Sequence, residues 1–258
     1  MTAPPIVRLE GVGKSYGPVE SLRDVTLEIG SNEIVGLIGD NGAGKSTLIK
    51  VLTGVEKPTS GEVHIRGRKI DFASYSVRRA QELRIETVHQ TSSLGEKQPL
   101  WRNFFVGRPI TNRFGFIKVR EQKRVSEEIM RGTIGFRGAG IDVDTPVSRL
   151  SGGERQGVAI GRAMHFDSDL IVLDEPTVAL ALSEVRKVLN FIRSIKERGH
   201  SCIFIEHNIV HIHEVCDRLV VLDRGRLVLD TPTSEIGYDD LIRFLTGLHL
   251  GSHDKSVS

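Results

Sequence analysis

The sequence predicts an α/β protein with a parallel β-sheet at its centre, and three observations carry this prediction. Several short apolar runs have the length and composition of buried strands, and the run Ile34–Ile38 is almost entirely apolar. This run leads through a glycine-rich turn into an apolar helical segment. Two later strand signals, Leu170–Leu173 and Cys202–Ile205, are separated by a helical pattern, as in a strand–helix–strand unit.

Length and composition limit the possible classes of protein. The chain has 258 residues, 39% of them hydrophobic and 26% charged, which is typical of a globular protein. The formal net charge of +2 lacks the basic excess of a nucleic-acid-binding protein, so we expect no nucleic-acid partner. Cys202 and Cys216 lie among apolar residues without metal-ligand spacing, which predicts buried, unpaired thiols.

The chain is expected to begin with a stretch of strands, to continue with a helical stretch, and to end with a stretch in which strands and helices alternate. The first stretch consists of strands and turns, and its last strand ends at His89 and Gln90. A middle stretch from Thr91 to about Phe166 changes to helices and loops with glycine and proline. We therefore expect one domain over residues 1–258, with a core of 1–90 and 167–258 and an inserted helical lobe of 91–166. The remaining expected elements are strands at Ile6–Leu9, Val25–Ile29, Glu62–Ile65, Lys69–Phe72 and Ile85–Val88, helices at Ser183–Glu197 and Ile209–Val215, a hairpin of Leu219–Leu222 and Leu227–Leu229, and a loose polar tail from Ser252.

The glycine-rich turn matches the pattern of a phosphate-binding loop. Glycines let the backbone wrap around a phosphate chain with its N–H groups pointing inward, and the helix that follows adds its positive dipole end. We expect Lys45 to bridge the β- and γ-phosphates of ATP, which also makes it catalytic, and Ser46 to ligate Mg²⁺. A glycine turn that binds nothing is disfavoured by the flanking strand and helix. The expected nucleotide-binding residues of the turn are Gly39, Asp40, Asn41, Gly42, Ala43, Gly44, Lys45, Ser46 and Thr47.

Two carboxylates follow the buried run Leu170–Leu173, where a parallel strand would reach the catalytic edge of the sheet. We expect Asp174 to hold Mg²⁺ through its water shell. Glu175 would then orient and polarise the attacking water as a general base. This pair of residues is common by itself, so its interpretation depends on the phosphate loop upstream.

A second glycine motif, Leu150-Ser151-Gly152-Gly153-Glu154-Arg155-Gln156, resembles the signature of the ATP-binding cassette (ABC) ATPases. Ser151, Gly152 and Gly153 precede an expected helix, Glu154–Met164, and offer a hydroxyl and N–H groups to a γ-phosphate. The resemblance implies an ATPase with the core fold of the phosphate-loop (P-loop) NTPases, which is RecA-like. It also implies an antiparallel β subdomain at the N-terminus and an inserted α-helical subdomain.

The resemblance implies roles for three further residues. Tyr16, in Lys14-Ser15-Tyr16-Gly17, is similar to the aromatic residue that stacks on adenine. Gln90 resembles the glutamine that touches Mg²⁺ and begins the loop that faces the permease. His207 resembles the switch histidine that contacts the γ-phosphate and takes part in catalysis.

The resemblance also implies an assembly. The signature of one cassette would close over the phosphate loop of another, so that ATP closes the dimer and hydrolysis reopens it. Since this chain carries one cassette, we expect a homodimer or a dimer with a related cassette. Transmembrane permease subunits would be direct partners and a solute-binding protein an indirect one. The chain would then lie at the cytoplasmic face of the cell membrane.

Three stretches are similar to the monosaccharide (ribose or fructose type) importers, namely Asn103–Arg108, Glu175–Leu180 and His207–Arg218. Many of those importers fuse two cassettes, so a single-cassette length is a departure. Ala181 stands where many cassettes have aspartate, which weakens any argument for signalling between the two sites through that residue. Glu206 stands where a small hydroxyl residue is common, and we expect its carboxylate to favour a protonated His207.

Other functions share some of these sequence features. An ABC ATPase for another solute remains open, because the solute is chosen by proteins outside this chain. A non-transport cassette ATPase would be indicated by tandem cassettes, a coiled-coil insertion or strong basic charge. A phosphate-loop kinase has no use for the motif at Ser151, and an inactive scaffold would not keep Lys45, Asp174 and Glu175 together.

Overall fold

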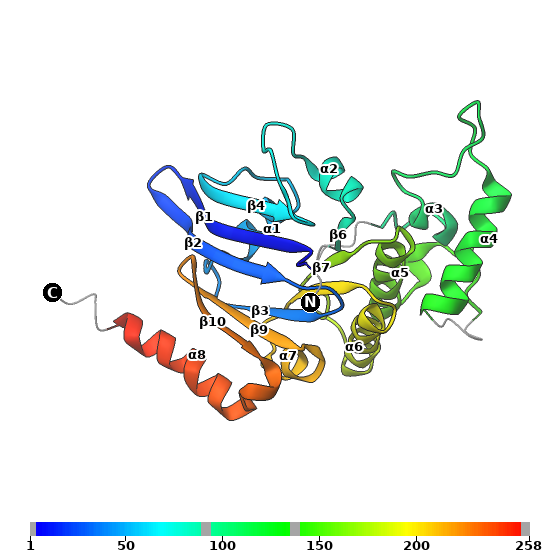
Figure 1. Cartoon of the computed structure of the whole chain (residues 1–258). Coiled ribbons are helices and arrows are strands. Elements are labelled where there is room, and N and C mark those ends of the chain that lie inside the picture. The colour runs from blue at the N-terminus through cyan, green and yellow to red at the C-terminus, as the bar shows by residue number, and fades with distance from the viewer. Residues whose placement is uncertain (1–3, 89–93, 135–139, 254–258) are drawn as a thin grey trace.

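The computed structural model describes residues 4–88, 94–134 and 140–253. Within these residues the strands form two sheets (Figure 1). A six-stranded sheet has the order β10-β9-β3-β8-β7-β6, and a four-stranded sheet has the order β2-β1-β4-β5. The bounds are β1 Val7–Tyr16, β2 Val19–Ile29, β3 Ile34–Ile38, β4 Ser60–Ile65, β5 Arg68–Lys69, β6 Ile85–Val88, β7 Leu170–Asp174, β8 Ser201–Ile205, β9 Arg218–Asp223 and β10 Arg226–Pro232.

The predicted fold class is confirmed by the pairing of these strands. β6, β7, β8, β3 and β9 run parallel to one another, while β10 pairs antiparallel with β9. The four-stranded sheet is antiparallel. Parallel strands need crossover connections, and these are helical here. The α-helices are α1 Lys45–Leu52, α2 Val77–Glu82, α3 Leu100–Phe104, α4 Val119–Ile129, α5 Gly152–His165, α6 Leu182–Glu197, α7 Ile209–Val215 and α8 Tyr238–His253.

Several predicted bounds were wrong for identifiable reasons. β1 and β2 are much longer than predicted, because register shifts between Leu9 and Ser15 carry the ladder past the glycines that broke the sequence pattern. The expected strand Lys69–Phe72 is only β5, since Ile70 and Phe72 turn in to pack on the core. The expected tail from Ser252 is still helical to His253.

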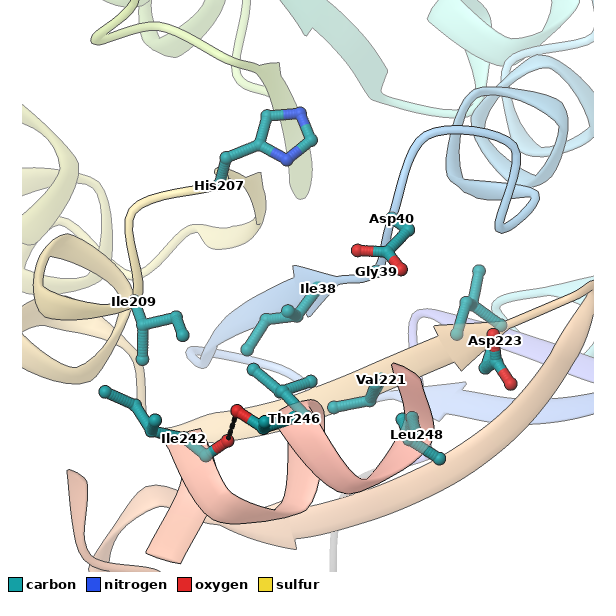
Figure 2. A pocket seen from close by; sticks show the side chains of 12 residues that line it. Ile38, Gly39, Asp40, His207, Ile209, Val221, Asp223, Ile242, Thr246 and Leu248 are labelled. Atoms are coloured by element: carbon teal, nitrogen blue, oxygen red, sulfur yellow. Dashed lines mark hydrogen bonds between the residues drawn. The ribbon is translucent and has the colours of Figure 1, made fainter. Parts of the chain in front are cut away.

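Helix α8 was not predicted and lies along β9 beside the phosphate loop. Figure 2 shows its residues Ile242, Thr246 and Leu248 in front of β9, which carries Val221, with the Ile242 side chain near Ile209. Together with Asp40 and the residues around β9 they line a pocket of about 290 Å³. The helix therefore forms one wall of a pocket that the phosphate loop also lines. Among the described residues, no helix combines the length and apolarity that crossing a membrane requires.

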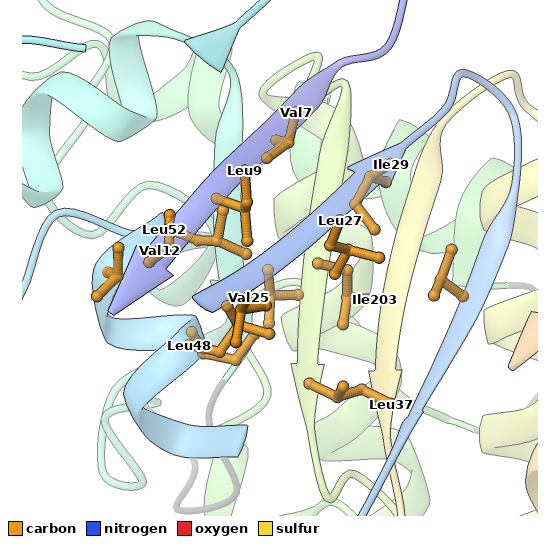
Figure 3. Packing of buried hydrophobic residues seen from close by; sticks show 14 of the residues in the cluster. Val7, Leu9, Val12, Val25, Leu27, Ile29, Leu37, Leu48, Leu52 and Ile203 are labelled. Carbon is orange, nitrogen blue, oxygen red and sulfur yellow. The ribbon is translucent and has the colours of Figure 1, made fainter. Parts of the chain in front are cut away.

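Apolar side chains fill both faces of the parallel sheet. Figure 3 shows one cluster, in which Leu9, Leu27 and Leu48 pack between the antiparallel sheet, α1 and the parallel sheet. The opposite face packs against α5, α6 and α7, as the helical spacing of Val188 and Ile192 predicts. Burial of each such side chain contributes about 1.5–3 kcal/mol. This packing fixes the sheet edge where the functional residues gather.

Candidate nucleotide-binding site

The phosphate loop joins the end of β3 to the start of α1. Gly42 and Gly44 have left-handed φ values of 85° and 107°. A Cβ on Gly44 would lie 2.6 Å from the carbonyl oxygen of Ser21, and one on Gly39 would collide with the carbonyl oxygen of Leu222. Glycine is therefore required at Gly39 and Gly44 by close backbone neighbours and at Gly42 by its dihedral angle.

Lys45 places a buried cation against this loop. Its Nζ donates hydrogen bonds to the carbonyl oxygens of Gly39 at 2.5 Å and Asp40 at 3.0 Å. Burial lowers the pKa of the Lys45 ammonium, and the carboxylates of Glu175, Asp40 and Asp174 oppose that shift. The structure thus brings the predicted lysine and both predicted carboxylates into one electrostatic neighbourhood.

The first turn of α1 carries the other two predicted residues of the loop. The Ser46 side chain is exposed at the start of the helix. The Thr47 hydroxyl instead lies 2.7 Å from the Ser21 hydroxyl and ties α1 to β2. The Ser46 hydroxyl and the Asp174 carboxylate are hard oxygen donors of the kind that Mg²⁺ prefers. Helix N–H groups and the Lys45 ammonium suit an anionic phosphate, so the residues present fit Mg-ATP.

The carboxyl ends of β7 and β8 bring the predicted catalytic pair together. Asp174 ends β7 opposite Ile205 of β8. Glu175 follows with a left-handed φ of 49°, and its N–H donates to the Ile205 carbonyl oxygen at 3.0 Å. His207 Nε2 and Glu175 Oε1 are 2.7 Å apart. A carboxylate held by an imidazole at this edge can take a proton from a bound water.

The Glu206 carboxylate contacts the backbone of His207, and its effect on the protonation of the His207 imidazole stays a prediction. The Glu206 side chain is buried, and its Oε1 accepts hydrogen bonds from the backbone N–H groups of His207 and Asn208. Its Oε2 accepts from the Thr177 hydroxyl. The His207 imidazole contacts Glu175 instead, because the Glu206 carboxylate turns inward. Sequence reasoning missed Thr177 as a partner of this carboxylate.

Tyr16 and Gln90 were predicted only from the family pattern. Tyr16 ends β1 with 42% of its surface exposed, and the Lys14 ammonium lies 4.9 Å from the centre of its ring. An exposed ring at the edge of the sheet has a face available for stacking. Gln90 lies outside the described residues.

The signature turn has a different construction from the phosphate loop. Helix α5 begins at Gly152, two residues earlier than predicted, because Ser151 is its N-cap. Ser151 Oγ accepts the Glu154 N–H at 3.3 Å, and Glu154 Oε2 accepts the Ser151 N–H at 2.9 Å, which is a capping box. Both glycines are therefore helical residues rather than parts of a preceding loop.

The two signature glycines allow α5 to approach α6. A Cβ on Gly152 would collide with the Leu180 side chain, and one on Gly153 would lie 3.1 Å from the Glu184 Cβ. A hydrogen bond from the Ser151 hydroxyl lowers the pKa of Glu184. Figure 1 shows α5 beside α6 and well to one side of α1. The chain therefore does not place its signature turn at its own phosphate loop.

Comparison with known proteins identifies the family. The model of the ABC transporter family matches residues 22–178. The chain is 38% identical over 246 residues to the xylose/arabinose import ATP-binding protein XylG of Sulfolobus acidocaldarius, covering 95% of this chain and 96% of that protein. It is 34% identical to the ribose import ATP-binding protein RbsA of Caldanaerobacter subterraneus, covering 96% of this chain but only 49% of that protein.

Solved structures agree with the fold. A nucleotide-free ATP-binding cassette from an ABC transporter superposes with a TM-score of 0.77 at 24% identity, covering 94% of this chain and 95% of that one. A dimeric post-hydrolysis cassette bound to ADP and Pi superposes with a TM-score of 0.72 at 25% identity, covering 88% of this chain and 98% of that one. The chain belongs to the ABC transporter family and is one of its ATP-binding cassette ATPases.

Proposed function

We propose that this ATPase powers a membrane importer for a monosaccharide of the pentose type. The observation that carries ATP hydrolysis as the driving reaction is the 2.7 Å contact between Glu175 and His207 at the sheet edge, in the electrostatic neighbourhood of Lys45. The class of solute is supported by the relatives, which are named for import of xylose, arabinose and ribose.

Within this proposal the residues of the chain divide the work. Lys45 and the loop N–H groups hold the β- and γ-phosphates, and Tyr16 stacks on the adenine. Ser46, Gln90 and Asp174 hold Mg²⁺, which would neutralise phosphate charge when bound. Glu175 orients the attacking water and takes its proton. His207 holds the Glu175 carboxylate and contacts the γ-phosphate.

We propose that the working unit is a head-to-tail dimer. In a single chain the signature turn lies to one side of the phosphate loop, so Ser151, Gly152 and Gly153 would have to act on the nucleotide of a second chain. A solved relative is dimeric in its ADP- and Pi-bound state, which supports this arrangement. ATP would close the dimer and hydrolysis would reopen it, with residues 91–166 moving as a lobe against the core.

The partners follow from the same proposal. The chain would bind transmembrane permease subunits at the cytoplasmic face of the membrane, and a solute-binding protein would deliver the sugar. Uptake of labelled ribose, xylose and arabinose by cells with and without the gene tests the solute class. Unchanged uptake of all three sugars would contradict it.

Substitution of the proposed general base tests the chemistry. Glu175→Gln keeps the shape of the side chain but removes the charge that accepts a proton. We expect ATP to bind as before and kcat to fall by about 10²–10⁴-fold. Steady-state phosphate release and ATP binding measure the two effects, with Glu127→Gln on the exposed face of α4 as the control. A kcat close to that of the unsubstituted protein would remove Glu175 from this role.

A further inference from the structure

A polar cluster built on two buried side chains lies next to the proposed catalytic pair. Glu206, at the end of β8, is 3% exposed, and Thr177, two residues after Glu175, is 6% exposed. The Thr177 hydroxyl donates to Glu206 Oε2 and lies 3.4 Å from His211 Nδ1. His211 Nε2 lies 3.2 Å from Asn208 Nδ2. The cluster thus joins the segment after β7 to the segment after β8.

The Glu206 carboxylate satisfies the backbone at the point where β8 ends. Its Oε1 accepts the N–H of His207 at 2.8 Å and the N–H of Asn208 at 3.2 Å. Backbone N–H groups are strong donors, and hydrogen bonds to a charged acceptor are roughly twice as strong as neutral ones. These bonds fix the direction in which the chain leaves β8, and therefore the place from which the His207 imidazole reaches Glu175.

Thr177 anchors the other half of the pair. The segment that begins at Glu175 is bonded to β8 through the Glu175 N–H and the Ile205 carbonyl oxygen. The Thr177 hydroxyl adds a second bond between the two segments, through Glu206. A serine in place of Glu206 has one oxygen on a short side chain, so it could not reach both backbone N–H groups and the Thr177 hydroxyl at once.

We propose that Glu206 is a positioning residue for hydrolysis, which acts with Thr177 to hold His207 and Glu175 at the distance that their contact requires. This inference rests on the proposed roles of Glu175 and His207. Glu206 itself is buried, and its hydrogen bonds go to Thr177 and to the backbone of His207 and Asn208, so it would act through the pair and not on the nucleotide. Misplacing a reacting group by about 1 Å can reduce a rate about 10²-fold, so the cluster governs turnover rather than binding.

Two pairs of substitutions test the proposal. Glu206→Ala and Thr177→Val remove the link between the segments, and we expect each to lower kcat about 10- to 100-fold while the Kd for ATP stays within about twofold. Glu206→Gln keeps an oxygen for the two N–H groups and an amide that can donate to Thr177, so it should retain most of kcat. Thr177→Ser, which keeps the hydroxyl, should do the same.

Ser126→Ala is the matched control. Its hydroxyl is also fully buried and bonded to a carbonyl oxygen, that of Gln122, but it lies in α4. We expect a stability loss without a change in kcat, measured by thermal unfolding and phosphate release. A uniform loss of stability, ATP binding and kcat in Glu206→Ala and Thr177→Val would mean a structural role only and would overturn the proposal.

Measuring Glu175→Gln in the same assay separates this inference from the proposed function. If Glu175→Gln abolishes turnover while Glu206→Ala and Thr177→Val keep kcat within about twofold, the positioning role is wrong and the general base stands. If Glu175→Gln keeps full turnover, the proposed function is wrong at that residue, whatever Glu206 does.

Discussion

Two glycine turns that each open a helix use glycine for different physical reasons. In the phosphate loop, Gly42 and Gly44 have left-handed φ values that most side chains disfavour. In the signature turn, Gly152 and Gly153 are ordinary helical residues, and their lack of a side chain admits Leu180 and Glu184 of the neighbouring segment.

The backbone N–H groups at the starts of α1 and α5 also differ in whether they already have hydrogen-bond partners. The N-cap of α1 is Gly44, which has no side chain to offer, so the first N–H groups of that helix are available to a phosphate. The N-cap of α5 is Ser151, whose oxygen already accepts the Glu154 N–H. Both motifs place glycines at the start of a helix, where backbone N–H groups can meet an anion. The surrounding chain decides whether those glycines are needed for backbone conformation or for packing.

Gly44→Ala should have the largest effect in this comparison. The new Cβ meets the Ser21 carbonyl oxygen at 2.6 Å, and the φ of 107° is strained for alanine by about 1–3 kcal/mol. We expect the loop to distort and ATP affinity to fall by at least about 10²-fold in a binding titration. Gly115→Ala, at a φ of 84° in open space, isolates the dihedral effect and should leave ATP affinity unchanged.

Gly152→Ala should act on stability instead. Its backbone is helical, so the expected cost of about 1–3 kcal/mol comes from overpacking against Leu180. Adding Leu180→Ala removes the side chain that the new Cβ meets. The double variant should therefore lose less stability than the two single variants together, measured by urea unfolding. ATP affinity of the isolated chain should not change in either variant. Additive losses would show that packing is not the reason for this glycine.

The smallest effect concerns pH. The Ser151 hydroxyl lowers the pKa of Glu184 below its ordinary 4.5 in the folded protein. The stability that this bond contributes is complete above pH 4.5 and is lost as pH falls through the lower, folded pKa. Glu184→Gln should therefore flatten the stability curve below pH 4.5, measured by thermal unfolding. Parallel curves for the two proteins would contradict this coupling.

The sequence predicted the parallel sheet and most of its strands closely, because buried strands there are short apolar runs bounded by turn residues. Helix α7 matched its predicted bounds at Ile209 and Val215. The prediction for β1 was too short because Gly11 and Gly13 interrupt the alternation of apolar and polar residues. Only pairing with β2 and β4 continues the strand through these glycines. Both cysteines are buried and free, as predicted. Helix α8 was not predicted because its apolar pattern is weaker, and its position beside β9 is visible only in the structure.

Local pattern by itself predicted the phosphate loop, while the carboxylates after β7 were interpreted together with that loop and the motif at Ser151 through its resemblance to the family signature. Tertiary structure decided which groups meet. Glu206 and His211 follow Thr177 by 29 and 34 positions in the chain. Only the neighbouring ends of β7 and β8 bring the three residues into one cluster, in which Thr177 and Glu206 are buried. Spacing along a chain carries no information about such contacts, since they depend on the register of parallel strands and on what burial requires of a carboxylate.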